Sequence, residues 1–281
     1  IYAGRDDPER TFANSFFWHE YRLDRQIHHY PKPYIALIDG VVMGGGVGVS
    51  VNGSHRVMTE AATFAMPETG IGLFPDIGAS WFLPCCPGEI GMYLGLTGQR
   101  LRAADTLYAG IGDVHVPADR LAALLDALAG AEALDGDGVA AILRNFAVDP
   151  GEAPLAAHRA AIDRCFSGDS VEDILARLAA EDGDWGRAQI ETLSTKSPTA
   201  LKVTFRQLRL GARIESIAEI MAMEYRLADR SFRGHDLFEG IRAVVIDKDG
   251  APKWDPTTLD AVSDADVDEY FVPVAGEPTF G

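Results

Sequence analysis

The sequence predicts an α/β fold over residues 1–116 and a mainly helical region over 117–281. Residues 34–40 form a short apolar, partly β-branched run that ends in glycine, which is typical of a strand buried on both faces. From Pro117 onward, apolar residues recur at the three- and four-residue spacing of amphipathic helices. A chain of 281 residues is long enough for one large domain or for one domain with an appendage.

Helices and strands are expected to alternate along the first part. Apolar residues at helical spacing predict a helix over 15–30, which the prolines directly after it end. Glycines at 43–48 predict a turn that leads from a strand into a buried helix. Residues 55–59 and 62–67 read as two short strands, and 68–78 is too rich in glycine and proline for a regular element. We therefore expect this last segment to be a loop that carries a site.

The remaining segments are predicted to be mostly helical. A helix over 88–96 and another beginning at Ala103 complete the α/β part near Val116. Later stretches with helical spacing are 121–128, 171–178, 201–208 and 225–245. Residues 130–138 and 148–154 read as linkers, and 275–281 as a weakly ordered tail.

Composition excludes several classes of protein. With 25 Lys and Arg against 42 Asp and Glu, the net charge is −17, so the chain lacks the clustered cations of a general nucleic-acid binder. The longest apolar stretch, 35–51, contains Asp39 and too many glycines for a membrane span. Three cysteines, two of them adjacent, predict a reducing compartment and no disulfide framework. An anionic ligand must therefore be met by local cations.

Common cofactor and metal motifs are absent or incomplete. Valines stand at positions 49 and 51, where a dinucleotide fingerprint beginning in the glycine turn requires glycine. Neither a phosphate-binding loop nor a Gly-x-Ser-x-Gly elbow is present. His19 lacks a second histidine four residues on, and His235 with Glu239 lacks a third ligand, so an ordinary surface pair or helix-start contact is favoured there. We expect no metal.

The glycine turn and the acidic loop after it form the constellation suited to chemistry. At a glycine that opens a helix, the Gly45 amide could donate to a developing oxyanion without a Cβ in the way. Glu68 and Asp76 lie among apolar residues, where desolvation raises a carboxyl pKa toward values useful for proton transfer. The alternative is a tight helix-packing contact with two solvated turn residues. Spacing alone leaves both interpretations open.

The sequence resembles the crotonase (enoyl-CoA hydratase/isomerase) superfamily. The resemblance rests on residues 30–40 (YPKPYIALIDG), the turn at 43–48 and the loop at 65–76. A closer similarity to the thioester-hydrolase branch of that superfamily rests on the segments 16–21, 96–98, 197–199, 223–227, 233–236, 239–243 and 247–249. It extends from about residue 12 to about residue 271, nearly the whole chain.

The resemblance implies repeated ββα units with a helical C-terminal part, and it assigns roles to single residues. Gly45 matches the glycine whose amide forms half of the family's oxyanion hole, and Glu68 matches the catalytic glutamate. Asp76 matches the second acid of the hydrolase branch, and Glu20 matches a glutamate that contacts substrate. The hydratases place their first catalytic glutamate where this chain has Gly48, which argues against hydration by paired glutamates.

The activity implied is hydrolysis of a short 3-hydroxyacyl-CoA thioester, 3-hydroxyisobutyryl-CoA in valine breakdown. Coenzyme A then enters as part of the substrate, and no separate cofactor is expected. The family's second oxyanion amide would lie before Ile1. Alternatives are an enoyl-CoA hydratase or isomerase and a non-catalytic acyl-CoA-binding homologue.

Partners and location follow from the same resemblance. Relatives commonly form trimers or dimers of trimers, so a homo-oligomer is possible, with no nucleic acid and no membrane as partner. The expected location is the cytoplasm in a bacterium or the mitochondrial matrix in a eukaryote. The cations considered for the phosphates of coenzyme A are Lys32, Arg100, Lys248 and Lys253, each of which can equally be ordinary solvated surface.

Overall fold

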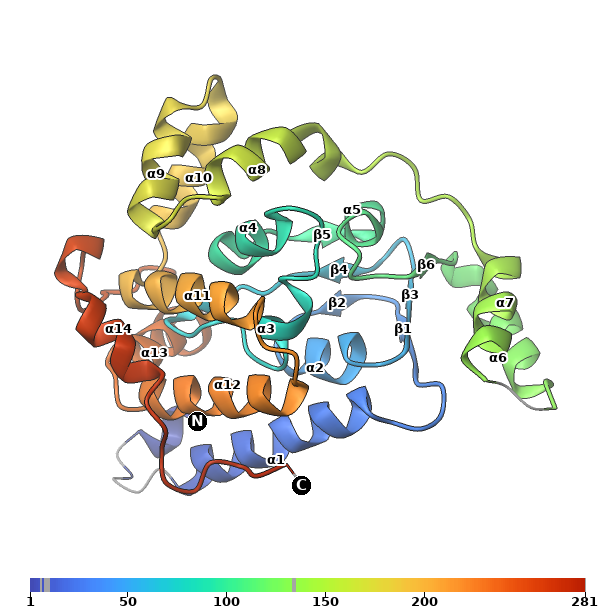
Figure 1. Ribbon diagram of the computed structural model, residues 1–281. Helices are drawn as coiled ribbons and strands as arrows, with labels where there is room; N and C mark the ends of the chain where they lie inside the picture. The colour runs from blue at the N-terminus through green and yellow to red at the C-terminus, as the bar shows by residue number, and fades with distance from the viewer. Residues whose placement is uncertain (6, 8–10, 133–134, 281) are drawn as a thin grey trace.

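The computed structural model describes residues 1–280 apart from 6, 8–10 and 133–134 (Figure 1). Its strands form two small sheets. The first has the order β1-β3-β6 and is parallel throughout, and in the second, β2-β4-β5, β4 pairs parallel with β2 and antiparallel with β5. The strands are β1 (Ile35–Ile38), β2 (Val41–Val42), β3 (His55–Met58), β4 (Thr63–Phe64), β5 (Leu101–Arg102) and β6 (Val114–His115).

Helices make up most of the rest of the described chain, as predicted. The α-helices are α1 (Thr11–His28), α2 (Gly45–Val51), α3 (Ala79–Phe82), α4 (Ile90–Thr97), α5 (Ala103–Tyr108), α6 (Leu121–Ala129), α7 (Gly136–Phe146), α8 (Arg159–Phe166), α9 (Val171–Ala180), α10 (Asp184–Ser194), α11 (Pro198–Gly211), α12 (Ile217–Ser231), α13 (Asp236–Ile241) and α14 (Asp264–Tyr270). The other helical turns are η1 (Tyr2–Gly4), η2 (Glu68–Ile71), η3 (Ala118–Arg120), η4 (Pro154–His158), η5 (Arg242–Ile246) and η6 (Leu259–Ala261).

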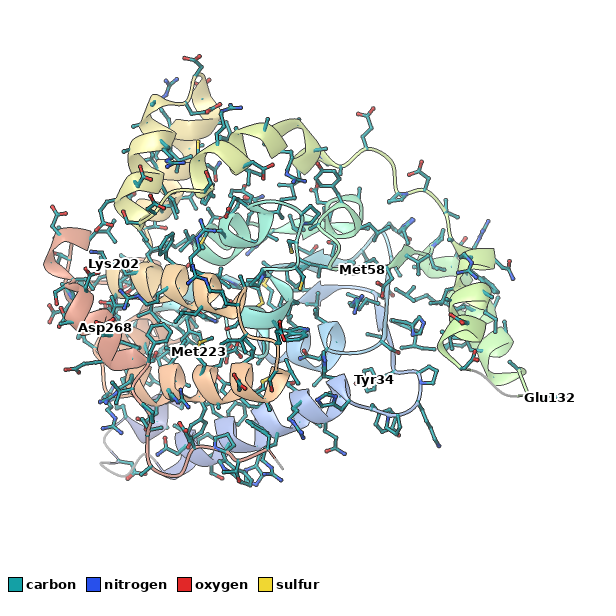
Figure 2. All side chains as sticks on the ribbon, viewed as in Figure 1. Tyr34, Met58, Glu132, Lys202, Met223 and Asp268 are labelled. Carbon is teal, nitrogen blue, oxygen red and sulfur yellow. The ribbon has the colours of Figure 1, made fainter. Side chains whose placement is uncertain are left out.

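One continuous core joins elements that lie far apart in the sequence. α1 packs against α12 and α2, while α12 also contacts α3 (Figure 1). Buried side chains fill the space between these layers, among them Met58 of β3 and Met223 of α12 (Figure 2). The pair α6–α7 stands beside β6, away from α9–α10, over a smaller core that includes Val57 and Leu124. The division of the chain into an α/β part, 1–116, and a mainly helical part, 117–281, stays a prediction.

The glycine turn has the predicted conformation. Gly44 adopts a φ of +53°, which an L side chain rarely tolerates, and α2 begins at the next residue. The strand expected over 34–40 is present as β1, and both of its faces are covered, as predicted. Ala36 and Ile38 pack on the main core, whereas Ile35 and Leu37 pack on the smaller one. Of these four residues, only Ile38 is fully buried.

Two helix boundaries differ from expectation for local reasons. Gly88 has a φ of +56°, so α4 begins only at Ile90. The helix expected over 225–245 is interrupted after α12 at Arg233 and Gly234, and the chain resumes as α13 and η5. Sequence patterning also missed α3 and β5, which are too short to show a period.

Candidate active site

Helix α1 brings three polar side chains to the site. Its buried stripe includes Phe17, Tyr21, Asp24 and Ile27, spaced as one helix face requires. Glu20 borders this stripe and is half-buried. The face of α1 that packs on α2 and α12 therefore carries two acids and a phenol among apolar residues.

Helix α2 presents a free backbone amide next to these acids. Among the described residues, no acceptor takes the Gly45 N–H, whereas the next two amides bond to Met43 and Gly44 oxygens. Gly45 is exposed, and a Cβ built on it would lie 3.0 Å from Oε1 of Glu20. Glycine at this position therefore leaves space for Glu20 and keeps the amide accessible to a ligand.

Glu68 is the first residue of η2 and is 4% exposed. Its Oε2 atom has no hydrogen-bond partner in the described part of the chain. Desolvation raises the pKa of Glu68 well above its usual value, and the negative charge of Asp76 raises it further. Glu68 is thus a weaker acid than an exposed glutamate, and it has a free oxygen with which to exchange a proton with a ligand.

Asp76 lies eight residues later and is also buried. Burial raises the pKa of Asp76 to about 6, although a hydrogen bond from Tyr21 acts in the opposite direction. The Tyr21 hydroxyl group donates to Oδ2 of Asp76 at 3.0 Å. The two loop carboxyls are coupled through charge, because ionised Asp76 raises the pKa of Glu68.

The backbone after Asp76 is held in a strained shape. Ile77 has a φ of +55°, which is rare for a β-branched residue, and Gly78 has a φ of +91°. The Asn52 side chain of the residue after α2 donates to the Ile77 carbonyl at 3.0 Å. From α12, Glu224 accepts the Gly78 and Ser80 amides at 2.8 and 2.9 Å. These contacts fix the direction in which Asp76 points.

The carboxyl groups of this region influence one another. Desolvation and then Asp76 raise the pKa of Glu20 to about 7. Desolvation raises the pKa of Glu224 to about 8. The hydrogen bonds that Glu224 accepts from Gly78 and Ser80 act in the opposite direction, because they favour its charged form. Glu20 and Glu224 therefore gain and lose protons near neutral pH, as groups in sites for acid–base catalysis do.

The structure brings all four predicted site residues to one place. Glu20 lies against Gly45, and the charge of Asp76 acts on both Glu20 and Glu68. Sequence reasoning missed Tyr21, Asp24 and Glu224. A signal for the first two existed, because Asp24 interrupts an apolar helical stripe one turn from Glu20, next to the phenol.

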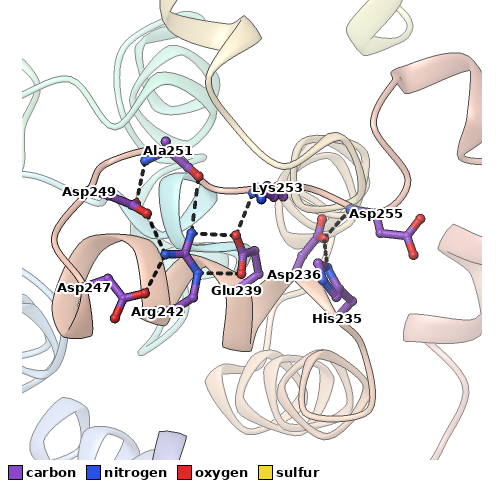
Figure 3. A network of polar contacts seen from close by, with 9 residues as sticks. All are labelled: His235, Asp236, Glu239, Arg242, Asp247, Asp249, Ala251, Lys253 and Asp255. Carbon is purple, nitrogen blue, oxygen red and sulfur yellow. Dashed lines mark hydrogen bonds and ion pairs between the residues drawn. The ribbon is translucent and has the colours of Figure 1, made fainter.

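The pair His235 and Glu239 does not form a ligand set. His235 bonds through Nδ1 to Asp236, whereas Glu239 pairs with Arg242 through both oxygens at 2.8 Å (Figure 3). The backbone amide of Lys253 donates to the same glutamate. The contact of His235, the residue before α13, with Asp236 is the helix-start contact favoured by the sequence, whereas the contacts of Glu239 join α13 to η5 and to the segment after it.

Comparison with known proteins identifies the family of this chain. Residues 1–271 match the family model described as enoyl-CoA hydratase/isomerase. The chain is 45% identical over 264 residues to "3-hydroxyisobutyryl-CoA hydrolase, mitochondrial" of Xenopus tropicalis, covering 92% of this chain and 68% of the relative. It is 41% identical over 276 residues to the human protein of the same name, covering 96% and 71%.

Two crystal structures share the fold over almost the whole chain. One, described as a carnitinyl-CoA dehydratase from Mycobacterium thermoresistibile, superposes with a TM-score of 0.91 at 41% identity and covers 100% of this chain and 79% of that one. The other, described as an enoyl-CoA hydratase from Rhodobacter sphaeroides, gives 0.88 at 34% identity, with 99% and 79% covered. No helix within the described residues is long and apolar enough to cross a membrane.

Because the family model matches residues 1–271, the chain belongs to the enoyl-CoA hydratase/isomerase family, the crotonase superfamily.

Proposed function

We propose that this protein hydrolyses the thioester of a short 3-hydroxyacyl-CoA, with 3-hydroxyisobutyryl-CoA as its substrate and 3-hydroxyisobutyrate and coenzyme A as products. The observation that carries the proposal is the buried pair Glu68 and Asp76, together with Glu20, which interacts with Asp76 through charge and lies against Gly45 with its free amide. Relatives 41–46% identical to this chain bear the name of that hydrolase. Coenzyme A is then part of the substrate, and no other cofactor is required.

The Gly45 amide would receive the thioester carbonyl oxygen. When a nucleophile adds to the carbonyl carbon, negative charge develops on this oxygen and the amide stabilises it. Loss of one such donor typically costs about 3 kcal/mol of transition-state stabilisation. The exposure of Gly45 and the half-burial of Glu20 next to it are consistent with a ligand that enters here.

Glu68 and Asp76 would supply the nucleophile and move the protons. In one route, ionised Glu68 takes a proton from water, whose oxygen adds to the carbonyl carbon before the carbon–sulfur bond breaks. In the other, the Glu68 carboxylate attacks directly, the thiolate leaves, and water then hydrolyses the anhydride. Asp76 orients the water in both routes, and the thiolate of coenzyme A takes up the remaining proton.

Absence of an acid at position 48 favours hydrolysis over hydration. A Cβ at Gly48 would lie 2.6 Å from Oδ1 of Asp24, so no side chain fits there without movement. Hydration by two glutamates, as the resemblance describes it for hydratases, would therefore lack its first glutamate. Hydration is the second candidate, because the two similar crystal structures are described as a dehydratase and a hydratase.

Release of free thiol separates these candidates. The full-length protein is offered 3-hydroxyisobutyryl-CoA and crotonyl-CoA side by side, and thiol is detected with a reactive dye while the enone absorbance is followed. The proposal predicts thiol from the hydroxyacyl thioester only. Loss of enone absorbance without thiol would instead establish a hydratase, and binding without either reaction would indicate a non-catalytic homologue.

A homo-oligomer is proposed on the family resemblance alone, and gel filtration of the same preparation tests it.

A further inference from the structure

Asp24 is an acid without a partner in the interior of the protein. It is 1% exposed, and neither carboxyl oxygen has a hydrogen-bond partner in the described chain. Other buried aspartates are satisfied. Asp105 accepts the Leu155 amide at 2.8 Å, and Asp236 accepts the Ser197 hydroxyl at 2.5 Å. Because an unpaired buried carboxyl is costly, Asp24 requires an explanation beyond packing.

Two carboxyl groups of α1 lie against two glycines of α2. Glu20 stands over Gly45, and Asp24 stands over Gly48, whose absent Cβ leaves room for it. The two acids are one helical turn apart on α1. Exposure falls along this row, because Gly45 is exposed, Glu20 half-buried and Asp24 buried. Asp24 therefore lies deeper in the protein than Glu20, on the same side of α1 as the free amide.

The surroundings of Asp24 favour its neutral form. Desolvation is the largest of the effects that raise the pKa of Asp24 to about 9, and the negative charges of Glu20, Asp76 and Glu224 supply the rest. Tyr21 on α1 points its hydroxyl group to Asp76. A protonated carboxyl group can donate one hydrogen bond and accept another, which is what an alcohol group requires of its partner.

The spacing along α2 matches the proposed substrate. From Gly45 to Gly48 a helix rises about 4.5 Å. In a 3-hydroxyacyl thioester, the hydroxyl oxygen lies three bonds from the carbonyl carbon, roughly 3 to 4 Å away by ordinary bond lengths. An acyl chain that runs inward from the amide of Gly45 thus brings its hydroxyl group to the level of Asp24.

We propose that Asp24 is a specificity-determining residue whose unpartnered carboxyl group binds the 3-hydroxyl group of the acyl chain. This inference rests on the proposed thioester substrate and adds the group that recognises its hydroxyl. A substrate without the hydroxyl group would leave the buried carboxyl unpaired, and so would be bound and turned over less well. The reaction then takes place at Gly45 and the recognition beside Gly48, one turn further along α2, where Asp24 of α1 lies.

The test compares 3-hydroxyisobutyryl-CoA with isobutyryl-CoA, which lacks only the hydroxyl group. In wild type, kcat/KM is expected to favour the hydroxyacyl thioester. Asp24→Leu should reduce this preference about ten- to hundredfold, whereas Asp24→Asn, whose amide still donates and accepts, should keep it. Equal losses on both thioesters, or an unchanged preference in a folded Asp24→Leu variant, would contradict the proposal.

A pH series provides the second readout. The wild-type preference should change as pH passes about 9, where Asp24 ionises and can accept from the hydroxyl group but no longer donate to it, and it should stay constant in Asp24→Asn. The same change in both proteins would overturn the proposal even if Asp24→Leu does not fold.

Calorimetric binding of both thioesters in the Glu68→Gln background tests recognition without turnover. If wild type releases no thiol, the proposed function fails, while the ratio of dissociation constants still decides the role of Asp24. Equal constants for the two thioesters in a protein that retains Asp24 would refute recognition of the hydroxyl group.

Discussion

The hydroxyl group of Tyr21 donates a hydrogen bond of 3.0 Å to Oδ2 of Asp76, and so joins α1 to the loop that carries both catalytic candidates. Tyr21 is fully buried, and its own pKa is raised well above the usual value, first by desolvation and then by Asp76. The phenol therefore remains a donor at any working pH and favours the charged form of Asp76.

Replacement of Tyr21 by Phe is expected to make Asp76 a weaker acid. Without the hydrogen bond, the pKa of Asp76 should rise above about 6, because burial then acts without that opposing contact. If ionised Asp76 is needed, activity is lost as pH falls through this pKa, so the acid limb of the kcat/KM profile moves to higher pH. Tyr93→Phe, in the buried α4, is the matched control and should not shift the limb. Superimposable profiles for Tyr21→Phe and wild type would exclude this role.

Glu224 is expected to position the loop through its two backbone contacts. In Glu224→Gln, one acceptor oxygen becomes an amide NH2 group, a donor that faces the backbone N–H of Gly78 or Ser80, and the unpaired backbone N–H costs about 1–3 kcal/mol. We expect a lower melting temperature and a lower kcat, since Asp76 loses its fixed direction. Glu219→Gln, exposed on the same helix, should change neither. A Glu224→Gln enzyme with wild-type kcat would show that the contacts of Glu224 with the Gly78 and Ser80 amides are not needed for the reaction.

The two interior glycines of α2 should respond oppositely to alanine. In Gly48→Ala, the new methyl group meets the Asp24 carboxyl at 2.6 Å, and overpacking of this kind costs about 1–3 kcal/mol of unfolding free energy. In Gly46→Ala the nearest atom is Cγ2 of Val42 at 3.7 Å, so the better helix former should stabilise by about 0.5–1 kcal/mol. Thermal unfolding of both variants tests this contrast, which equal shifts in one direction would refute.

Patterns of local chemistry were sufficient to predict much of the fold. The apolar period of α1 and the glycines at 44–46 specify a helix and a turn through sterics that act within a few residues. The partial burial of Ile35, Ala36 and Leu37 in β1 could not be predicted in this way, because the degree of burial depends on which elements pack around the strand. Breaks such as that at Gly234 likewise depend on packing between distant elements rather than on the local period.

Prediction of the site had a similar limit. Gly45, Glu68 and Asp76 stood out because glycine and acid residues are unusual in apolar segments. Glu224 is almost 150 positions from the loop, and nothing in its helix indicates that its side chain reaches the backbone of Gly78. Such partnerships arise only from the packing of α12 on α3, which the sequence pattern does not encode locally.

The central claim is that the buried Glu68 carboxyl group performs the hydrolysis, and thiol release by Glu68→Gln tests it most directly. Steady-state release from 3-hydroxyisobutyryl-CoA is measured alongside Glu269→Gln, an exposed control on α14, with substrate binding checked by calorimetry. The account predicts that Glu68→Gln binds the thioester but releases thiol about 10²–10⁴-fold more slowly, as loss of an acid–base group does. A Glu68→Gln variant that hydrolyses the thioester at the wild-type rate would contradict it.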